Sequence, residues 1–339
     1  MTTLAMLTLL PLASSLLACA DGATVPKGVT PIAIPGGDGG VGFDDLQFAP
    51  ALGKVVVPAG RTGALVLIDP KTRAVETIEG FAKKDAFSGG HGDGTTSADS
   101  GDGLLFAIDR TAMKVVVVDP VAKKIASSAP LAADPDYVRF LASARELWVT
   151  EPDAESIEVF ALGEKPTDAP RPIAKIAVAG GPEALVFDAT RGRAYTHLWD
   201  GATVAIDVKE RKIVARWKNG CAGSRGMVLD EARGFLIVGC AEGRAAVLDV
   251  AHDGKELSSL TAGDGVDVIA WDAKRRHVYF PGGKSATLAV IAVSEKGELS
   301  LLGTVPIAKG SHCVAADGDG RAFVGDPRGG RILEIDDQW

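Results

Sequence analysis

Residues 184–207 read ALVFD-ATRG-RAYTHLW-DG-ATVAID, three short apolar segments separated by polar turns. Apolar runs of this length, bounded by Gly and Asp, are typical of strands joined by hairpin turns. Residues 226–249 repeat the pattern as GMVLD-EARG-FLIVGC-AEGR-AAVLD. The sequence therefore contains a module of three antiparallel strands that occurs more than once.

The module recurs along the chain with a regular period. Further copies lie at 46–70, 95–120, 138–162, 268–293 and 313–336, the one at 138–162 being the least regular. Their third strands end about every 44 residues, which is the period of one propeller blade. A more polar fourth strand follows each copy, as at 74–80, 212–218 and 299–305. We therefore predict an all-β fold, a seven-bladed β-propeller with four-stranded antiparallel blades.

The last copy ends after three strands at Trp339 and lacks its outer strand. An apolar segment at 29–35 precedes the first copy and belongs to none of the modules. We expect this N-terminal strand to close the last blade, because closure removes an exposed sheet edge. Residues 29–339 are then one propeller domain.

Composition limits the classes of partner. The 339 residues carry a net charge of −8, with 46% hydrophobic and 24% charged residues. This is a globular composition, and an acidic surface without a basic stripe argues against nucleic-acid binding. Four cysteines are too few for a disulfide scaffold. We expect a monomer.

The N-terminus resembles an export signal. Residues 4–18 are apolar, and Leu16-Leu17-Ala18-Cys19 resembles the lipobox of bacterial lipoproteins. That resemblance implies a signal peptide at 1–18, a lipid on Cys19, a tether at 19–28 and a membrane-anchored location in the bacterial cell envelope, periplasmic or surface-exposed. Met1-Thr2-Thr3 lacks the usual positive charge, and Ala18-Cys19-Ala20 also fits cleavage for plain secretion. Secretion is therefore the alternative.

The chain also resembles the YVTN-type (YncE-like) seven-bladed propellers of bacterial envelopes, over nearly all of residues 29–339. The resemblance rests on the blade openings at 90–92, 180–184 and 263–267, and on Cys221 and Cys240 around GMVLDEARGFLIVG. It implies the fold and an envelope location. It implies no shared catalytic residues.

The cysteines fall into a pair and a single residue. Cys221 and Cys240 flank one predicted hairpin, and antiparallel pairing would bring them within bonding distance. We predict a disulfide worth about 3 kcal/mol for a loop of this length, with two reduced thiols as the alternative. Cys313 lies on an innermost strand and is interpreted as a small buried hydrophobe, with a metal role beside His312 as the alternative.

A candidate site lies where the loops that enter the innermost strands converge on the channel. The residues at the aligned position before each innermost strand are Asp45, Gly94, Asp136, Glu183, Arg225, Asp267 and His312, and Asp93 and His91 lie next to Gly94. A ring of like charges in a narrow mouth raises carboxylate pKa values and attracts cations. We predict a site for a metal ion or a cationic or polyhydroxylated ligand, with Arg225 as an anion contact. The alternative is that these residues only solvate the funnel and cap strand ends.

No catalytic residues are predicted. Ser224 lies in a sequence similar to a nucleophile elbow, AGSRG at 222–226, but no strand–turn–helix context surrounds it. The favoured function is non-enzymatic binding of a small ligand, metal or protein partner at the channel mouth. We expect no cofactor, with a divalent cation as the alternative. The alternatives are a metal-dependent lactonase-like hydrolase or lyase, whose mouth carboxylates hold a cation that polarises a carbonyl, and a pure interaction scaffold. The single asparagine, Asn219, lies outside the predicted ring, which weakens the enzymatic alternative.

Overall fold

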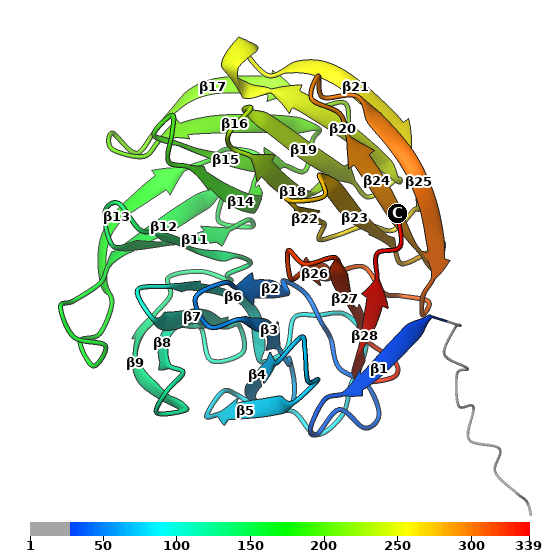
Figure 1. Ribbon diagram of the computed structural model, residues 1–339. Coiled ribbons are helices and arrows are strands. Elements are labelled where there is room, and N and C mark those ends of the chain that lie inside the picture. Colours follow the sequence, from blue (N-terminus) through cyan, green and yellow to red (C-terminus); the bar gives the residue numbers. More distant parts are fainter. Residues whose placement is uncertain (1–27) are drawn as a thin grey trace, which may run out of the picture.

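The computed structural model describes residues 28–339 and shows seven four-stranded antiparallel sheets arranged around a central axis (Figure 1). This confirms the predicted seven-bladed β-propeller. The predicted signal peptide at 1–18, the predicted lipidation site Cys19 and all of the predicted tether at 19–28 except Gly28 lie outside the described residues.

Each blade is formed by consecutive strands, from the innermost to the outermost. The first four blades comprise β2 (Gln47–Ala49), β3 (Lys54–Pro58), β4 (Ala64–Ile68) and β5 (Val75–Glu79); β6 (Thr95–Gly101), β7 (Leu104–Asp109), β8 (Lys114–Asp119) and β9 (Lys124–Pro130); β10 (Val138–Leu141), β11 (Glu146–Glu151), β12 (Ser156–Ala161) and β13 (Arg171–Ala177); and β14 (Pro182–Asp188), β15 (Arg193–Leu198), β16 (Ala202–Asp207) and β17 (Lys212–Lys218). The last three comprise β18 (Ser224–Asp230), β19 (Phe235–Cys240), β20 (Arg244–Asp249) and β21 (Lys255–Thr261); β22 (Ala270–Asp272), β23 (His277–Gly282), β24 (Thr287–Val293) and β25 (Leu299–Pro306); and β26 (Val314–Ala316), β27 (Arg321–Asp326) and β28 (Arg331–Asp336) with β1 (Val29–Ala33).

The Asp at the end of several third strands has a local structural role. The Asp69 carboxylate accepts hydrogen bonds from the backbone N–H groups of Lys71 and Thr72, both at 2.9 Å. Asp119 and Asp207 make the same pair of bonds to the turns that follow them. Asp is suited to this position because its short side chain satisfies the backbone donors of a tight turn. The repeated Asp therefore marks the turn to the outermost strand.

The hydrophobic core lies between neighbouring blades. Middle strands are buried on both faces, so they read as continuous apolar runs. Between blades three and four, for example, Trp148 packs edge-to-face on Phe187, with 5.3 Å between ring centroids, and Val159 and Ile206 belong to the same buried cluster. A single blade leaves such faces exposed, so the modules are stable only as a ring.

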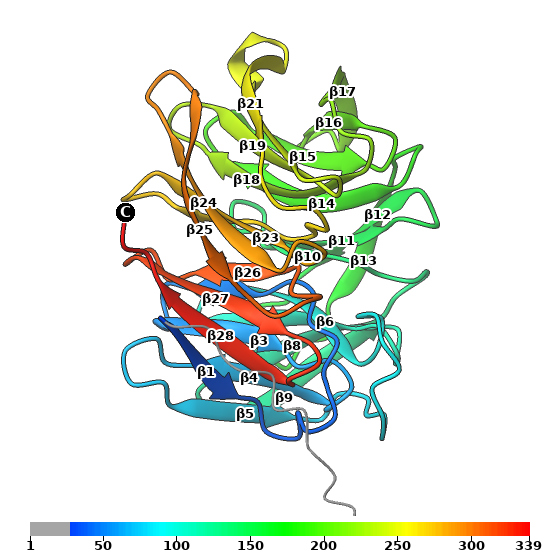
Figure 2. The same cartoon turned by 90° about the vertical axis from the view of Figure 1, so that its right-hand side faces the viewer.

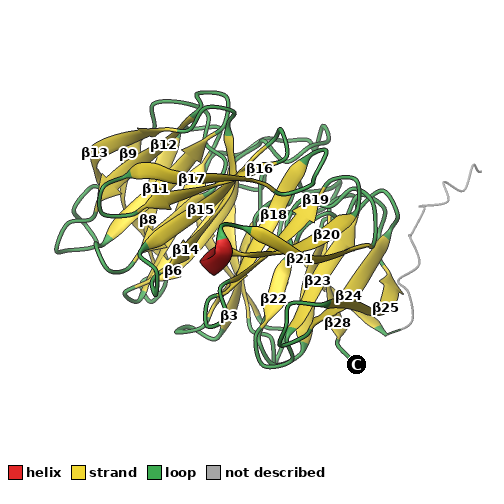
Figure 3. Cartoon of the chain, turned by 90° about the horizontal axis from the view of Figure 1, so that it is seen from above, coloured by secondary structure: helices red, strands yellow, loops and turns green. Residues whose placement is uncertain are grey.

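The N-terminal strand closes the ring as predicted. Strand β1 pairs antiparallel with β28, from Val29 opposite Ile335 to Ala33 opposite Arg331 (Figure 2). Third strands run away from the channel mouth, so Val29 enters the ring at the face opposite the mouth. The helical content of residues 28–339 is the short 3-10 turn η1 (Val250–His252), coloured red in Figure 3, and no helix within this range is long and apolar enough to cross a membrane.

Candidate functional site

The loops that lead into the innermost strands bring most of the predicted site residues together. A cavity of about 190 Å³ at the mouth is lined by His91, Arg110, Asp134, Asp136, Pro152, Asp153, Glu183, Trp199, Arg225 and Asp267. His312 borders the same region, because its ring centroid lies 5.2 Å from that of His91. Asp93 lies on the rim, where its carboxylate pairs with Lys84.

Asp45 is not brought to this cavity. Its carboxylate is fully buried, and both oxygens are bound by the Arg139 guanidinium, at 2.6 Å and 2.9 Å. Ser97 and Gln47 donate two further hydrogen bonds to it. Asp45 is therefore a fully paired structural residue that links blades one to three. In blade one, the residue that faces the mouth is its neighbour Asp44.

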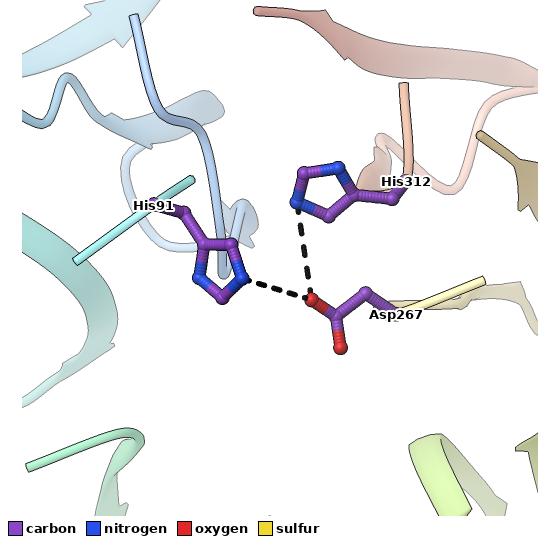
Figure 4. Close-up of side chains that lie close together, drawn as sticks. All are labelled: His91, Asp267 and His312. Carbon is purple, nitrogen blue, oxygen red and sulfur yellow. Dashed lines mark ion pairs between the residues drawn. The ribbon is translucent and has the colours of Figure 1, made fainter. Parts of the chain in front are cut away.

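His91, Asp267 and His312 form a compact group at the mouth (Figure 4). The Asp267 Oδ2 atom lies 3.6 Å from His91 Nε2 and 3.8 Å from His312 Nε2. These distances exceed those of hydrogen bonds. The two imidazoles thus point the same type of nitrogen at one carboxylate without bonding to it.

The other ring nitrogen of each histidine, Nδ1, contacts an oxygen atom on the side away from the mouth. His312 Nδ1 lies 2.6 Å from the Gly310 carbonyl oxygen, and because a carbonyl only accepts, Nδ1 is the donor. His91 Nδ1 lies 3.0 Å from Oδ2 of Asp44, which is 1% exposed. A hydrogen bond therefore orients the His312 ring and an ion pair with Asp44 places the His91 ring, and both leave Nε2 toward the mouth.

The remaining carboxylates are incompletely neutralised. Arg110 Nη1 lies 3.3 Å from Asp136 Oδ1. Arg225 approaches Glu183 and Asp267 only to 3.7 Å and 3.9 Å, too far for hydrogen bonds. Glu183 also accepts a hydrogen bond from the Trp199 indole. The cavity therefore contains more buried carboxylates than closely paired cations.

Burial and mutual repulsion change the acidity of these groups. Desolvation and the nearby Asp44 raise the pKa of Asp136 well above its ordinary value. Desolvation and Asp267 raise the pKa of Glu183 to about 7. The Asp44 carboxylate raises the pKa of His91 to about 10. These shifts reflect burial and the excess of carboxylates at the mouth, which favour the protonated forms of Asp136, Glu183 and His91.

Six residues at the mouth were not predicted from the sequence: Asp44, which contacts His91, and the cavity-lining residues Arg110, Asp134, Pro152, Asp153 and Trp199. Arg110 and Trp199 directly follow the second strands β7 and β15, whose ends pair with the starts of the innermost strands, as Leu198 does with Pro182. An antiparallel hairpin places these two positions at the same end of the sheet. The residue that follows each second strand could therefore have been predicted to lie at the mouth.

The predicted disulfide is present, between Cys221 and Cys240 at the mouth end of blade five. Next to it, Asn219 is fully buried and donates hydrogen bonds to Thr203 and Ser224. Cys313 is buried, and burial raises the pKa of its thiol. Among the described residues, the candidate metal-binding group around His312 does not include Cys313.

A second cavity of about 630 Å³ occupies the opposite end of the channel. It is lined mainly by apolar residues of the innermost strands, with Tyr137 and Arg139 among its polar contacts. The charged residues of its lining are paired within the protein: Arg139 with Asp45, Lys274 with Asp319, and Asp317 with Arg321. The incompletely paired carboxylates described above lie at the mouth instead.

The architecture defines the chain as a β-propeller, and comparison with solved structures agrees. The hydrazine synthase of Kuenenia stuttgartiensis is similar at a TM-score of 0.73 and 12% identity, over 88% of this chain and 96% of that one. The β-propeller domain of Cps50 (Swd1) from Myceliophteria thermophila gives 0.69 and 14%, over 88% and 98%. U3-55K gives 0.73 and 12%, over 92% and 100%. These similarities show the fold alone.

The sequence matches no protein-family model and no curated protein.

Proposed function

We propose that the protein is a non-enzymatic binding protein whose channel mouth holds a small cationic ligand. One observation carries this proposal: Asp136, Glu183 and Asp267 line a cavity of about 190 Å³ in which Arg110 pairs with Asp136 at 3.3 Å, whereas Arg225 stays 3.7 Å and 3.9 Å from Glu183 and Asp267. A cation entering this cavity gains the attraction of buried carboxylates that the protein itself leaves underneutralised. The exposed indole of Trp199 adds an aromatic surface for it.

Calorimetry and thermal shift with a panel of simple cations test this function. The probes are tetramethylammonium, Mg²⁺, Ca²⁺ and Zn²⁺ on tag-free protein. We expect one probe or more to bind and raise the melting temperature, and we expect Glu183→Gln, Asp136→Asn and Asp267→Asn each to weaken binding at least tenfold. Asp319→Asn is the matched control, because Asp319 pairs with Lys274 in a turn at the opposite end. Binding that none of the three mouth variants changes would contradict the proposal.

We further propose that the protein is an exported, YncE-like propeller held in the cell envelope by a lipid on Cys19, with secretion as the alternative. The disulfide supports export, because such bonds persist in oxidising compartments. The described chain begins at the face opposite the mouth, so an anchor there would leave the mouth directed away from the membrane. Membrane fractionation of the wild type and Cys19→Ala tests the anchor: release of the variant alone into the soluble fraction supports it.

An enzymatic alternative is favoured by the position of His91 and Asp267 on the cavity wall. A divalent cation held there would face the cavity, where it could polarise the carbonyl of a lactone. A panel of γ- and δ-lactones, with the protein supplied with Zn²⁺ or Mn²⁺, tests this hydrolase. Turnover that Asp267→Asn abolishes would favour it over simple binding.

A protein partner is a separate proposal for the same face. Propellers of similar fold are found in assemblies, such as the mitotic checkpoint complex. A partner would have to present a cationic side chain to the mouth, so Glu183→Gln would weaken its capture as well.

A further inference from the structure

We infer that the cation is a divalent first-row transition metal, bound by Nε2 of His91, Nε2 of His312 and the carboxylate of Asp267. This inference rests on the proposed cation site and specifies its chemistry. Imidazole nitrogen is a preferred ligand of Zn, Cu, Fe and Ni, whereas Mg²⁺ and Ca²⁺ take oxygen ligands. A pair of histidines beside one carboxylate therefore selects the first group.

The spacing of the three side chains suits such an ion. A tetrahedral ion about 2.0–2.1 Å from each ligand holds the ligand atoms about 3.3 Å apart. The Asp267 oxygen lies 3.6 Å and 3.8 Å from the two imidazole nitrogens, and all three ligand atoms fall within 4.8 Å of one another. The two separations from Asp267 are too long for hydrogen bonds and a few tenths of an ångström wider than the ion needs.

The groups behind the ligands provide an independent observation. Metal-bound histidines usually donate their second ring N–H to a carboxylate or a backbone carbonyl, which fixes the tautomer and aims the first nitrogen. The Gly310 carbonyl faces His312 in this way, and the Asp44 carboxylate lies 3.0 Å from His91 Nδ1 as an ion pair. This contact lacks the geometry of a hydrogen bond, so His91 Nδ1 and Asp44 Oδ2 have no hydrogen-bond partner, and His312 Nε2 is also buried without one. A buried polar atom without a partner costs free energy of folding. A metal ion bound to His312 Nε2 would supply that atom with a partner directly.

Three protein ligands leave a fourth position for water or a ligand. His91 and Asp267 line the cavity that also contains Glu183, Arg225 and Trp199, so the fourth position opens toward these residues. This is the arrangement of metal sites that exchange a ligand rather than of closed structural sites. The bound metal would therefore be accessible from the mouth.

Titration with Co²⁺ and Zn²⁺ tests the inference on the full mature chain. We expect one ion per chain, a visible Co²⁺ absorption spectrum of nitrogen and oxygen coordination, and displacement of Co²⁺ by Zn²⁺. His91→Gln and His312→Gln should each weaken Zn²⁺ binding at least 100-fold. His252→Gln is the matched control, because His252 also pairs with a carboxylate, Asp249, but lies exposed on another part of the ring. Circular dichroism checks that each variant is folded. The two histidines come from different blades, so if one variant does not fold, the other still tests the site.

The results separate this inference from the proposed function. Zn²⁺ affinity that is unchanged in both His91→Gln and His312→Gln, or no stoichiometric Co²⁺ or Zn²⁺ binding, overturns the transition-metal site. If Ca²⁺ or tetramethylammonium still binds and this binding depends on Glu183, the proposed cation site remains. If no probe depends on any mouth residue, both fail.

Discussion

Closure of the ring depends on strand β1, and Ile32 is the residue that tests it best. Ile32 is 5% exposed, lies opposite Ile332 in the β1–β28 pairing and belongs to a buried cluster that continues into blade one. Truncation of a buried isoleucine to alanine costs about 2–5 kcal/mol, the lost transfer energy plus the cavity left behind. Since domains of this kind are stable by about 5–15 kcal/mol, Ile32→Ala should remove a large fraction of the stability.

Urea unfolding followed by tryptophan fluorescence and circular dichroism measures the effect. With a denaturant slope of about 1–3 kcal/mol/M, the midpoint should fall by about 1 M or more. Ile32→Val should fall between the wild type and Ile32→Ala, at a cost of about 1 kcal/mol. Ala33→Ser is the control, because the adjacent residue is exposed on the same strand and should change stability by no more than about 0.5 kcal/mol. If Ile32→Ala unfolds at the same urea concentration as Ala33→Ser, strand β1 does not hold the ring closed.

Three further predictions concern the site and its support. Replacing both Cys221 and Cys240 by Ala should lower the free energy of unfolding by about 3 kcal/mol. Dithiothreitol should lower the free energy of unfolding of the wild type by the same amount and leave that of the variant unchanged. If dithiothreitol destabilises the wild type and the variant equally, the disulfide assignment is contradicted. His197 is fully buried, and burial lowers its pKa to about 3. Below about pH 6.5 this histidine is therefore protonated in the unfolded chain but stays neutral in the folded chain. Stability should therefore fall from pH 7 to pH 5 by about 2 kcal/mol more in the wild type than in His197→Asn, and parallel pH profiles in urea unfolding would exclude this contribution. Asp44→Asn should weaken Zn²⁺ binding about 10–100-fold and alter the Co²⁺ spectrum. The melting temperature of the metal-free protein should change little. Unchanged Zn²⁺ affinity would show that Asp44 does not position His91.

The sequence predicted the ring more completely than the site, and particular residues show why. The period of the modules is a long-range signal, and Asp69, Asp119 and Asp207 mark equivalent turns because the same backbone donors must be satisfied in each blade. Asp44 and Asp45 are chemically identical neighbours, and successive residues of an extended chain point to opposite sides. The innermost strand of blade one is short, Gln47–Ala49. Its position in the sequence therefore did not show whether Asp44 or Asp45 points toward the mouth. The choice depends on Arg139, a residue of blade three that only the folded ring places beside Asp45.

The mouth and the closure of the ring are physically linked. Asp44 and His91 precede blades one and two, whereas Asp267 and His312 precede blades six and seven, so the group joins the two ends of the chain. The noncovalent β1–β28 pairing closes the ring in which these four residues approach one another. A ligand that bridges them binds the closed ring and not an opened one, and at 100 times its dissociation constant it stabilises the closed state by about 2.7 kcal/mol. This is similar in size to the loss expected for Ile32→Ala, so a cation at the mouth would restore much of the stability that a weakened strand β1 loses.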